Sequence, residues 1–143
     1  MNHVGSSVNL HIVVNGKILL LRRISQRWMH GKLQIPGGHV DEGESPMQAV
    51  LREAHEELGI KAGPADVTLA STVAVREGEA EYFALQFRLI NPEKFTFRIM
   101  EPQKCSELIW ADIHKLPDDT IDLFRIIIDQ AQLNGQTYIE MGY

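Results

Sequence analysis

The chain has 143 residues, of which 44% are hydrophobic and 23% charged, so its length fits one domain and its composition excludes disordered and fibrous proteins. A formal net charge of −5 argues against a dedicated duplex-DNA binder, and we expect no polymeric nucleic acid partner. A nucleotide remains compatible with this charge, because a divalent cation can bridge an acidic protein and an acidic ligand. The single cysteine, Cys105, cannot form an internal disulfide, which favours a reducing compartment, most simply the cytoplasm.

The sequence also argues against a membrane protein. Its longest strongly aliphatic run covers residues 18–21, far short of the ~20 apolar residues that a spanning helix needs. The first residues place no basic group before an apolar stretch, so we expect no secretory signal. No repeat, low-complexity tract or linker divides the sequence, and we expect one domain over residues 1–143.

The first predicted elements are strands at residues 8–14 and 17–22, joined by a tight turn at Asn15-Gly16. This dipeptide supplies the two positive φ angles of a two-residue hairpin. The stretch between Ser25 and Gly43 contains three glycines and one proline among few periodic apolar residues, which predicts a loop. Further strands are predicted at 67–75, 81–90 and 108–113, with a hairpin turn at 76–79, and a second helix is predicted at 122–133.

The clearest helix signal lies at residues 45–58. Ser45 can cap the helix, Pro46 suits its first position, and Gln48 completes a capping box. Gly59 follows in the position that a C-terminal glycine favours. Apolar residues recur between them at spacings of three and four, and they form one face: Met47, Val50, Leu51, Ala54 and Leu58. We expect this face to pack on a sheet.

The opposite face of this helix is acidic. Glu53 stands three and four residues before Glu56 and Glu57, a spacing at which like charges destabilise a helix. A solvated acidic face is the simplest interpretation of such a pattern. Unrelieved repulsion favours a second interpretation, in which a cation lies among the carboxylates, and hard oxygen ligands suit Mg²⁺ or Mn²⁺ better than zinc.

The glycine pair before the helix joins the acidic face in one longer motif. Gly38, Glu44 and the run of residues 52–60, Arg-Glu-Ala-His-Glu-Glu-Leu-Gly-Ile, resemble the complete Nudix box over residues 38–60. Residues 33–39 and 100–107, with Trp110, are similar to MutT-type nucleotide hydrolases. The resemblance implies an α/β fold, the Nudix-type α/β/α sandwich with a mixed curved sheet between helices.

The resemblance also implies roles for individual residues. Glu53, Glu56 and Glu57, with the Gly38 carbonyl, would hold one to three Mg²⁺ ions, for which Mn²⁺ can substitute. Arg52 would orient a glutamate of this cluster. Glu53 is the first candidate for the general base and Glu56 the second. Two further residues are open: Glu44 would fix the loop–helix junction or complete the outer metal shell, and Glu101 is either near the metals or a surface residue of a loop.

The implied reaction is attack of water on a nucleoside triphosphate, releasing nucleoside monophosphate and pyrophosphate. The alternatives are a hydrolase of another nucleoside diphosphate derivative, such as a nucleotide sugar, and a non-catalytic regulatory domain that binds a nucleotide. The base and the oligomeric state, monomer or homodimer, stay open.

Residues outside the box carry weaker signals. Trp110 either flanks the base or belongs to the core. Asp118 and Asp119 either read the base or form an acidic cluster at a helix N-terminus. We expect His39 to hydrogen-bond within its loop and Cys105 to be an inert buried thiol.

Overall fold

The computed structural model describes residues 4–143, so residues 1–3 of the predicted domain lie outside the described residues. Five strands form the larger sheet: β1 (Gly5–His11), β5 (Gly37–His39), β6 (Val67–Glu77), β7 (Ala80–Leu89) and β9 (Tyr138–Met141). Their order is β5-β1-β7-β6-β9, with β1–β7 and β6–β9 parallel and the other pairs antiparallel. The sheet is therefore mixed, as predicted.

A second sheet is built around β3 (Lys17–Arg23). This strand pairs antiparallel with β2 (Val13–Val14), β4 (Leu33–Gln34) and β8 (Cys105–Asp112). The prediction of one sheet was therefore incomplete, because the strands divide between two.

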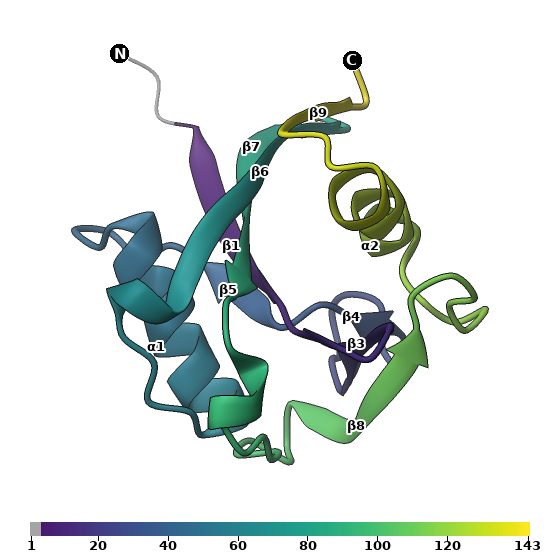
Figure 1. Ribbon diagram of the computed structural model, residues 1–143. Coiled ribbons are helices and arrows are strands. Elements are labelled where there is room, and N and C mark those ends of the chain that lie inside the picture. Colours follow the sequence, from purple (N-terminus) through teal and green to yellow (C-terminus); the bar gives the residue numbers. More distant parts are fainter. Residues whose placement is uncertain (1–3) are drawn as a thin grey trace.

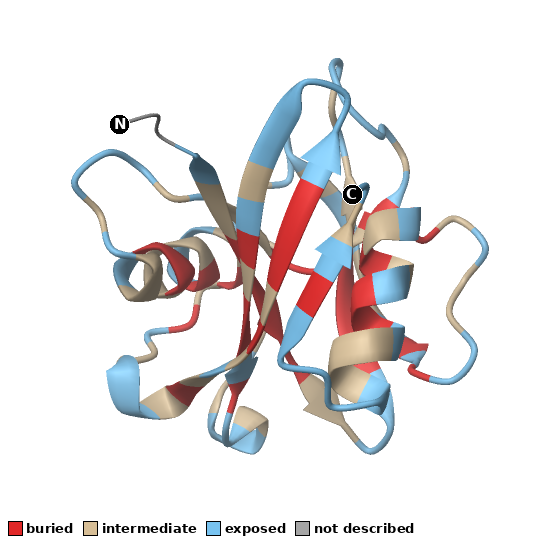
Figure 2. Cartoon of the chain, turned by 90° about the horizontal axis from the view of Figure 1, so that it is seen from above, coloured by how far each residue is buried: buried red, intermediate tan, exposed pale blue. Residues whose placement is uncertain are grey.

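Helices cover both faces of the larger sheet (Figures 1 and 2). Helix α1 (Pro46–Leu58) lies on one side, and α2 (Asp122–Ile127) lies on the other, where it continues into the π-helical segment η3 (Ile128–Leu133). Two short 3₁₀ turns, η1 (Pro64–Asp66) and η2 (Pro92–Lys94), complete the elements. The α/β fold class and the second helix are confirmed. Within the described residues, no helix is long and apolar enough to cross a membrane.

Helix α1 begins and ends as its sequence predicts. The Ser45 side chain accepts a hydrogen bond from the Gln48 backbone N–H, and the Gln48 side chain accepts one from the Ser45 backbone N–H. Gly59 ends the helix with a φ of 73°, in the left-handed region that glycine enters without a steric cost. These caps fix where the acidic face of the helix starts and stops.

Two hydrophobic cores hold the layers together, one on each face of the larger sheet. The apolar face of α1 packs on β1, β3, β6 and β7, where Val50, Ala54 and Leu58 are at most 2% exposed. On the other face, α2 and η3 bury Phe124, Ile127 and Ile128. Figure 2 shows the buried residues along the inner strands and the helix faces turned toward them.

The predicted N-terminal hairpin is wrong in its extent. Asn15 and Gly16 form the predicted turn with φ angles of 51° and 74°, but only Val13 and Val14 pair across it with β3. The residues before them leave the hairpin, because β1 joins β7 and β5 in the larger sheet. The second hairpin is confirmed, with a shorter turn than predicted, since β6 and β7 pair up to Glu77 and Ala80.

The prediction of a continuous loop between Ser25 and Gly43 is also wrong, because this stretch contains β4 and β5. These strands have two and three residues, too few to show a periodic pattern. Strand β5 pairs with β1 and leads into α1, so the glycine pair belongs to the sheet that supports the acidic helix.

Candidate active site

The site is built where β5 meets the acidic face of α1. The Gly37 backbone N–H donates a hydrogen bond of 3.1 Å to Oε1 of Glu57. A Cβ atom on Gly38 would lie 2.3 Å from Oε1 of Glu53, so only glycine leaves room for that carboxylate. The two glycines therefore allow the strand to approach two carboxylates of the helix directly.

A cavity of about 340 Å³ opens beside these carboxylates, and we call it the acidic cavity. Glu53, Glu57 and Glu101 line it, so the structure brings the downstream Glu101 to the same place as two glutamates of the box. Basic groups line it as well: Arg22, Arg23 and Lys104, the last of which contacts Glu101 at 3.4 Å. The cavity thus offers both carboxylates and cations to a ligand.

Glu57 is the most perturbed acid of this cavity. Burial raises the pKa of its carboxyl well above the usual range, and the neighbouring Glu53 raises it further. The hydrogen bond from the Gly37 N–H acts in the opposite direction but is the weaker influence. The charged form of this carboxyl is therefore disfavoured unless a cation lies beside it.

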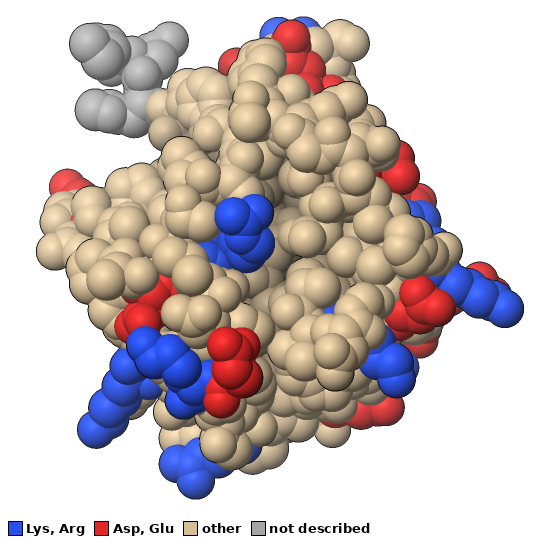
Figure 3. All heavy atoms as spheres, in the orientation of Figure 1, with Lys and Arg blue, Asp and Glu red and all other residues tan. Residues whose placement is uncertain are grey.

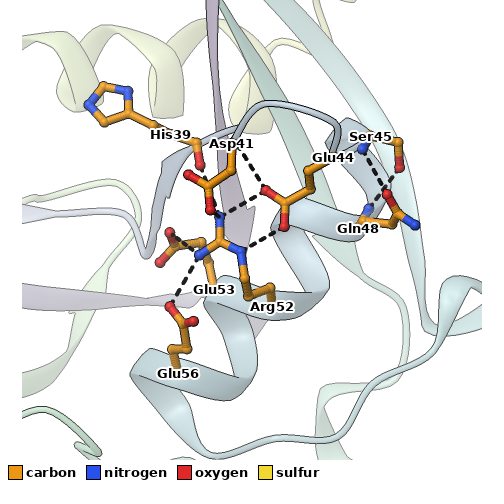
Figure 4. Close-up of polar contacts among 8 residues, drawn as sticks. All are labelled: His39, Asp41, Glu44, Ser45, Gln48, Arg52, Glu53 and Glu56. Carbon is orange, nitrogen blue, oxygen red and sulfur yellow. Dashed lines mark hydrogen bonds and ion pairs between the residues drawn. The ribbon is translucent and has the colours of Figure 1, made fainter.

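Arg52 organises the start of the helix (Figure 4). Its Nε and Nη2 donate to the two oxygens of Glu44 at 2.7 and 2.9 Å, and its Nη1 donates to Glu53 and Glu56 at 3.0 and 3.1 Å. Nη2 also donates to the His39 backbone carbonyl at 3.1 Å. All five guanidinium N–H groups therefore have acceptors within the protein, and none is left to bind a ligand.

Glu44 is tied to both sides of the loop–helix junction. Besides the two bonds from Arg52, it accepts a hydrogen bond of 3.0 Å from the Asp41 backbone N–H. These bonds lower the pKa of the Glu44 carboxyl to about 2, with the Arg52 guanidinium as the largest cause. Glu44 does not line the acidic cavity.

Glu56 lies outside the acidic cavity as well. Its side chain is 45% exposed, compared with 16% for Glu53, and its contact is with Arg52. Among residues 4–143, no three acidic, histidine or cysteine side chains already have their ligand atoms gathered as around a metal ion. The carboxylates of Glu53 and Glu57 nevertheless fit a hard divalent cation, because both are oxygen donors that line the same cavity.

A second cavity, of about 240 Å³, lies between the sheets and α2, and we call it the inner cavity. It shares Arg23, Gln34 and Gly37 with the acidic cavity, so the two are neighbours. Aromatic side chains contribute to its wall: Trp28, Tyr82 and Phe124. An aromatic wall of this kind suits a flat, conjugated ligand group.

Arg23 stands at the boundary of the two cavities. Its Nη1 donates to Oε1 of Gln34 at 2.7 Å, its Nε donates to the Trp28 carbonyl at 3.2 Å, and its guanidinium lies 4.8 Å from the Trp28 ring centre. Burial lowers the pKa of Arg23, while the nearby Glu57 raises it. The sequence analysis missed Arg23 and Trp28, because a basic residue at a strand end and a tryptophan in a loop give no local pattern.

Trp110 does not line either cavity. It lies on β8 with 38% of its surface exposed, and its ring meets Phe97 edge to face at 5.8 Å between centres. It therefore belongs neither to the buried core nor to the walls described above.

The remaining candidates of the sequence analysis are placed as follows. Asp119 pairs with Arg22 at 2.5 Å, whereas Asp118 lines a surface pocket that shares Trp28, Glu77 and Leu123 with the inner cavity. The His39 ring is exposed and points away from Arg52 (Figure 4). Cys105 lines the acidic cavity half-buried, and burial raises the pKa of its thiol, which disfavours the reactive thiolate.

On the face shown in Figure 3, acidic and basic side chains lie next to one another and form no field of one sign. A field of positive charge would be expected of a surface that tracks a nucleic acid backbone.

A family described as NUDIX domain matches residues 5–130. The chain belongs to this family. Among solved NUDIX structures, the MutT NUDIX hydrolase from Burkholderia pseudomallei superposes with a TM-score of 0.76 at 28% identity, over 90% of this chain and 98% of that chain. The fold described above is therefore the fold of a MutT-type NUDIX protein.

Two curated relatives match over shorter segments. The 8-oxo-dGTP diphosphatase of Escherichia coli is 48% identical over 46 residues, which is 32% of this NUDIX chain and 36% of that protein. The RNA pyrophosphohydrolase of Tolumonas auensis is 43% identical over 72 residues, which is 48% of this chain and 37% of that protein. The match thus spans little more than a third of the length of each of these two relatives.

Proposed function

We propose that this NUDIX protein is a divalent-metal-dependent hydrolase that cleaves nucleoside triphosphates, including oxidised or modified ones, to nucleoside monophosphate and pyrophosphate. The observation that carries this proposal is the pairing of the two cavities. The acidic cavity suits cation-bound phosphates, and the aromatic inner cavity suits a base; they meet at Arg23, Gln34 and Gly37. A nucleotide can therefore occupy both at once.

Glu53, Glu57 and the Gly38 carbonyl would hold Mg²⁺, or Mn²⁺ in its place, with Glu101 as a further ligand or an outer-shell group. A bound divalent cation would neutralise phosphate oxygens and lower the pKa of a bound water. The raised pKa of Glu57 supports this assignment, because a cation beside the carboxyl would stabilise the charged form that burial and Glu53 disfavour.

Glu53 is the proton acceptor in this proposal. It lines the acidic cavity beside Gly38, whereas Glu56, the other candidate base, is held outside by Arg52. Water attacks an inner phosphorus, its proton passes to Glu53, and the bond to the departing pyrophosphate breaks. Arg52 is a positioning residue, since its donors are all used in holding Glu44, Glu53, Glu56 and the β5 backbone.

The names of the two relatives, a diphosphatase and a pyrophosphohydrolase, support attack on a phosphoric anhydride. They differ in whether the substrate is a free nucleotide or the end of an RNA. We favour the free nucleotide, because the chain carries a formal net charge of −5.

A substrate panel with pyrophosphate detection tests the proposal. Ordinary, deoxy and oxidised nucleoside triphosphates are compared at equal concentration with a nucleotide sugar and a 5′-triphosphorylated RNA, each with and without Mg²⁺. We expect Mg²⁺-dependent pyrophosphate release from free triphosphates, lost in Glu57→Gln and retained in Glu79→Gln, a matched change in the exposed β6–β7 turn. Faster cleavage of the sugar or the RNA identifies that alternative, and binding without turnover identifies the regulatory one.

We also predict that the chain forms a single domain, that the protein resides in a reducing compartment, and that it is a monomer or a homodimer. Size-exclusion chromatography with light scattering, with and without nucleotide, distinguishes the two oligomeric states.

A further inference from the structure

Three polar side chains lie deep between the larger sheet and the second helix layer. Asn9 and His11 alternate with apolar residues along β1, and Gln86 lies beside them on β7. Such an alternation normally marks a strand with one solvated face. Here the polar face is buried, since Asn9, His11 and Gln86 are 6%, 2% and 0% exposed. Buried polar groups of this kind are kept only where they are hydrogen-bonded or used.

Their hydrogen bonds run in one direction. His11 Nε2 lies 2.8 Å from Oε1 of Gln86, and an amide oxygen can only accept, so His11 is the donor. Gln86 Nε2 then donates to Oδ1 of Asn9 at 2.9 Å. The oxygen of Asn9 is thereby used, and its Nδ2 makes no hydrogen bond to the side chains or backbone of residues 4–143. The chain of bonds ends in an unused donor.

This donor lies at the wall of the inner cavity. Asn9 lines that cavity, and its Nδ2 would be 2.7 Å from a Cβ atom on Gly37, one of the residues that both cavities share. The surrounding wall is largely apolar or aromatic, with Ile35, Ala84 and Phe124 among its residues. A ligand group in this cavity therefore meets a fixed N–H donor on the side that adjoins the acidic cavity, where the phosphates of a nucleotide would lie.

We propose that Asn9 is a specificity-determining residue, which donates from Nδ2 to a keto oxygen of the substrate's base. Gln86 and His11 are positioning residues, because their bonds decide which end of the Asn9 amide faces the cavity. This inference rests on the proposed function, since it assumes that the base of a nucleotide enters the inner cavity. The protein should therefore prefer bases with a keto group at the contact point over bases with an amino group there.

The experiment compares nucleotide pairs that differ in one keto-for-amino exchange: ITP with ATP, and UTP with CTP. One of these pairs should fit the cavity. For that pair, we expect the wild-type kcat/KM to be at least about tenfold higher for the keto nucleotide than for the amino nucleotide, mainly because KM is lower. In Asn9→Ala the ratio should fall to about one. Melting temperatures are recorded for each variant, so that a loss of folding is recognised.

Gln86→Glu is the decisive variant, because it leaves Asn9 in place. A carboxylate at position 86 accepts from His11 but cannot donate to Asn9, so the Asn9 amide must turn its Nδ2 toward that carboxylate and its oxygen toward the cavity. We expect the preference to reverse in favour of the amino member. Gln136→Glu, at an exposed position near the C-terminus, is the matched control and should keep the wild-type ratio.

The outcomes separate the two proposals. Ratios that stay within about twofold of wild type in folded Asn9→Ala and Gln86→Glu, while turnover continues, overturn the role of Asn9. A wild type that releases no pyrophosphate from these nucleotides or from any other triphosphate of the substrate panel overturns the proposed function instead. In that case calorimetric binding of IMP and AMP decides the Asn9 proposal: wild type should bind IMP more tightly and Gln86→Glu should bind AMP more tightly, and equal affinities would overturn it.

Discussion

The backbone N–H of Gly37 donates to the buried carboxyl of Glu57 at 3.1 Å, and this bond ties the end of the larger sheet to the acidic face of α1. It fixes one carboxyl oxygen of Glu57, and the same carboxyl interacts with Glu53. The strand therefore positions the acidic residue that burial makes hardest to ionise. This relationship explains why stability and catalysis should oppose each other at this residue.

Glu57→Gln is expected to separate the effect of this residue on stability from its effect on catalysis. Gln keeps an oxygen for the Gly37 N–H and removes a carboxyl that repels Glu53, and its helix propensity is close to that of Glu. The metal-free variant should melt no lower than metal-free wild type. Mg²⁺ should raise the melting temperature of wild type and raise that of the variant much less, because the native state has lost a ligand. Turnover should fall at least about a hundredfold.

Glu79→Gln is the control for this prediction, because it makes the same chemical change at an exposed turn. It should match wild type in its Mg²⁺ response and its turnover. Equal Mg²⁺ shifts and equal turnover in Glu57→Gln and wild type would remove Glu57 from the metal site and restore the interpretation of a solvated acidic face.

Arg52→Lys tests whether the guanidinium is needed for its shape. Lysine keeps the charge but cannot donate to both oxygens of Glu44 and also reach Glu53 and the His39 carbonyl. We expect the free energy of unfolding to fall by about 1–3 kcal/mol and kcat to fall with little change in KM. Chemical denaturation and steady-state kinetics measure the two effects. A variant with wild-type kcat would show that Arg52 only stabilises the junction.

Glu44 should make part of the protein's stability depend on acid pH. Its pKa is about 2 in the folded protein, below the ordinary glutamate value of 4.5. Because folding lowers this pKa, the contribution is complete above about pH 4.5 and is lost as pH falls toward about 2. Melting temperatures of wild type and Glu44→Gln, measured from about pH 7 down to about pH 2.5, should converge as the pH falls. A constant difference across this range would contradict the assignment.

Two tryptophans of similar exposure test whether the base binds in the inner cavity or against β8. Trp28 lines the inner cavity, whereas Trp110 contacts Phe97 outside it. Trp28→Ala should raise KM about ten- to a hundredfold, the scale of base–aromatic stacking at ~1–3 kcal/mol, and Trp110→Ala should change KM less than about threefold. If instead Trp110→Ala raises KM and Trp28→Ala does not, the base lies against β8 and the inner cavity has another role.

How far the sequence predicts this molecule depends on whether a signal is local. Helix α1 is predicted to its ends, because Ser45, Gln48 and Gly59 act within a few residues of each end of the helix. The split between β1 and β2 is not predicted, because an apolar run looks the same whichever sheet its strands join. Strands β4 and β5 are too short for any periodic pattern.

The same distinction applies to the site. Glu53 and Glu57 belong to one motif and are found together, and their position beside Gly37 and Gly38 follows from the pairing of β5 with β1. Arg23 comes to the site from another strand, so no spacing in the sequence links it to the acidic helix. Asn9 and His11 did carry a signal, since two polar residues alternate with apolar ones in β1, but the pattern alone indicates a solvated face.

Phosphorus-31 NMR of the reaction products is the most direct test of the central claim, that the carboxylates beside Gly37 and Gly38 support metal-dependent attack on an inner phosphorus. With the best triphosphate of the panel and Mg²⁺, the purified protein should produce nucleoside monophosphate and pyrophosphate in equal amounts, and neither after chelation of the metal. Orthophosphate and nucleoside diphosphate as the first products, or the same products from Glu57→Gln at the wild-type rate, would contradict it.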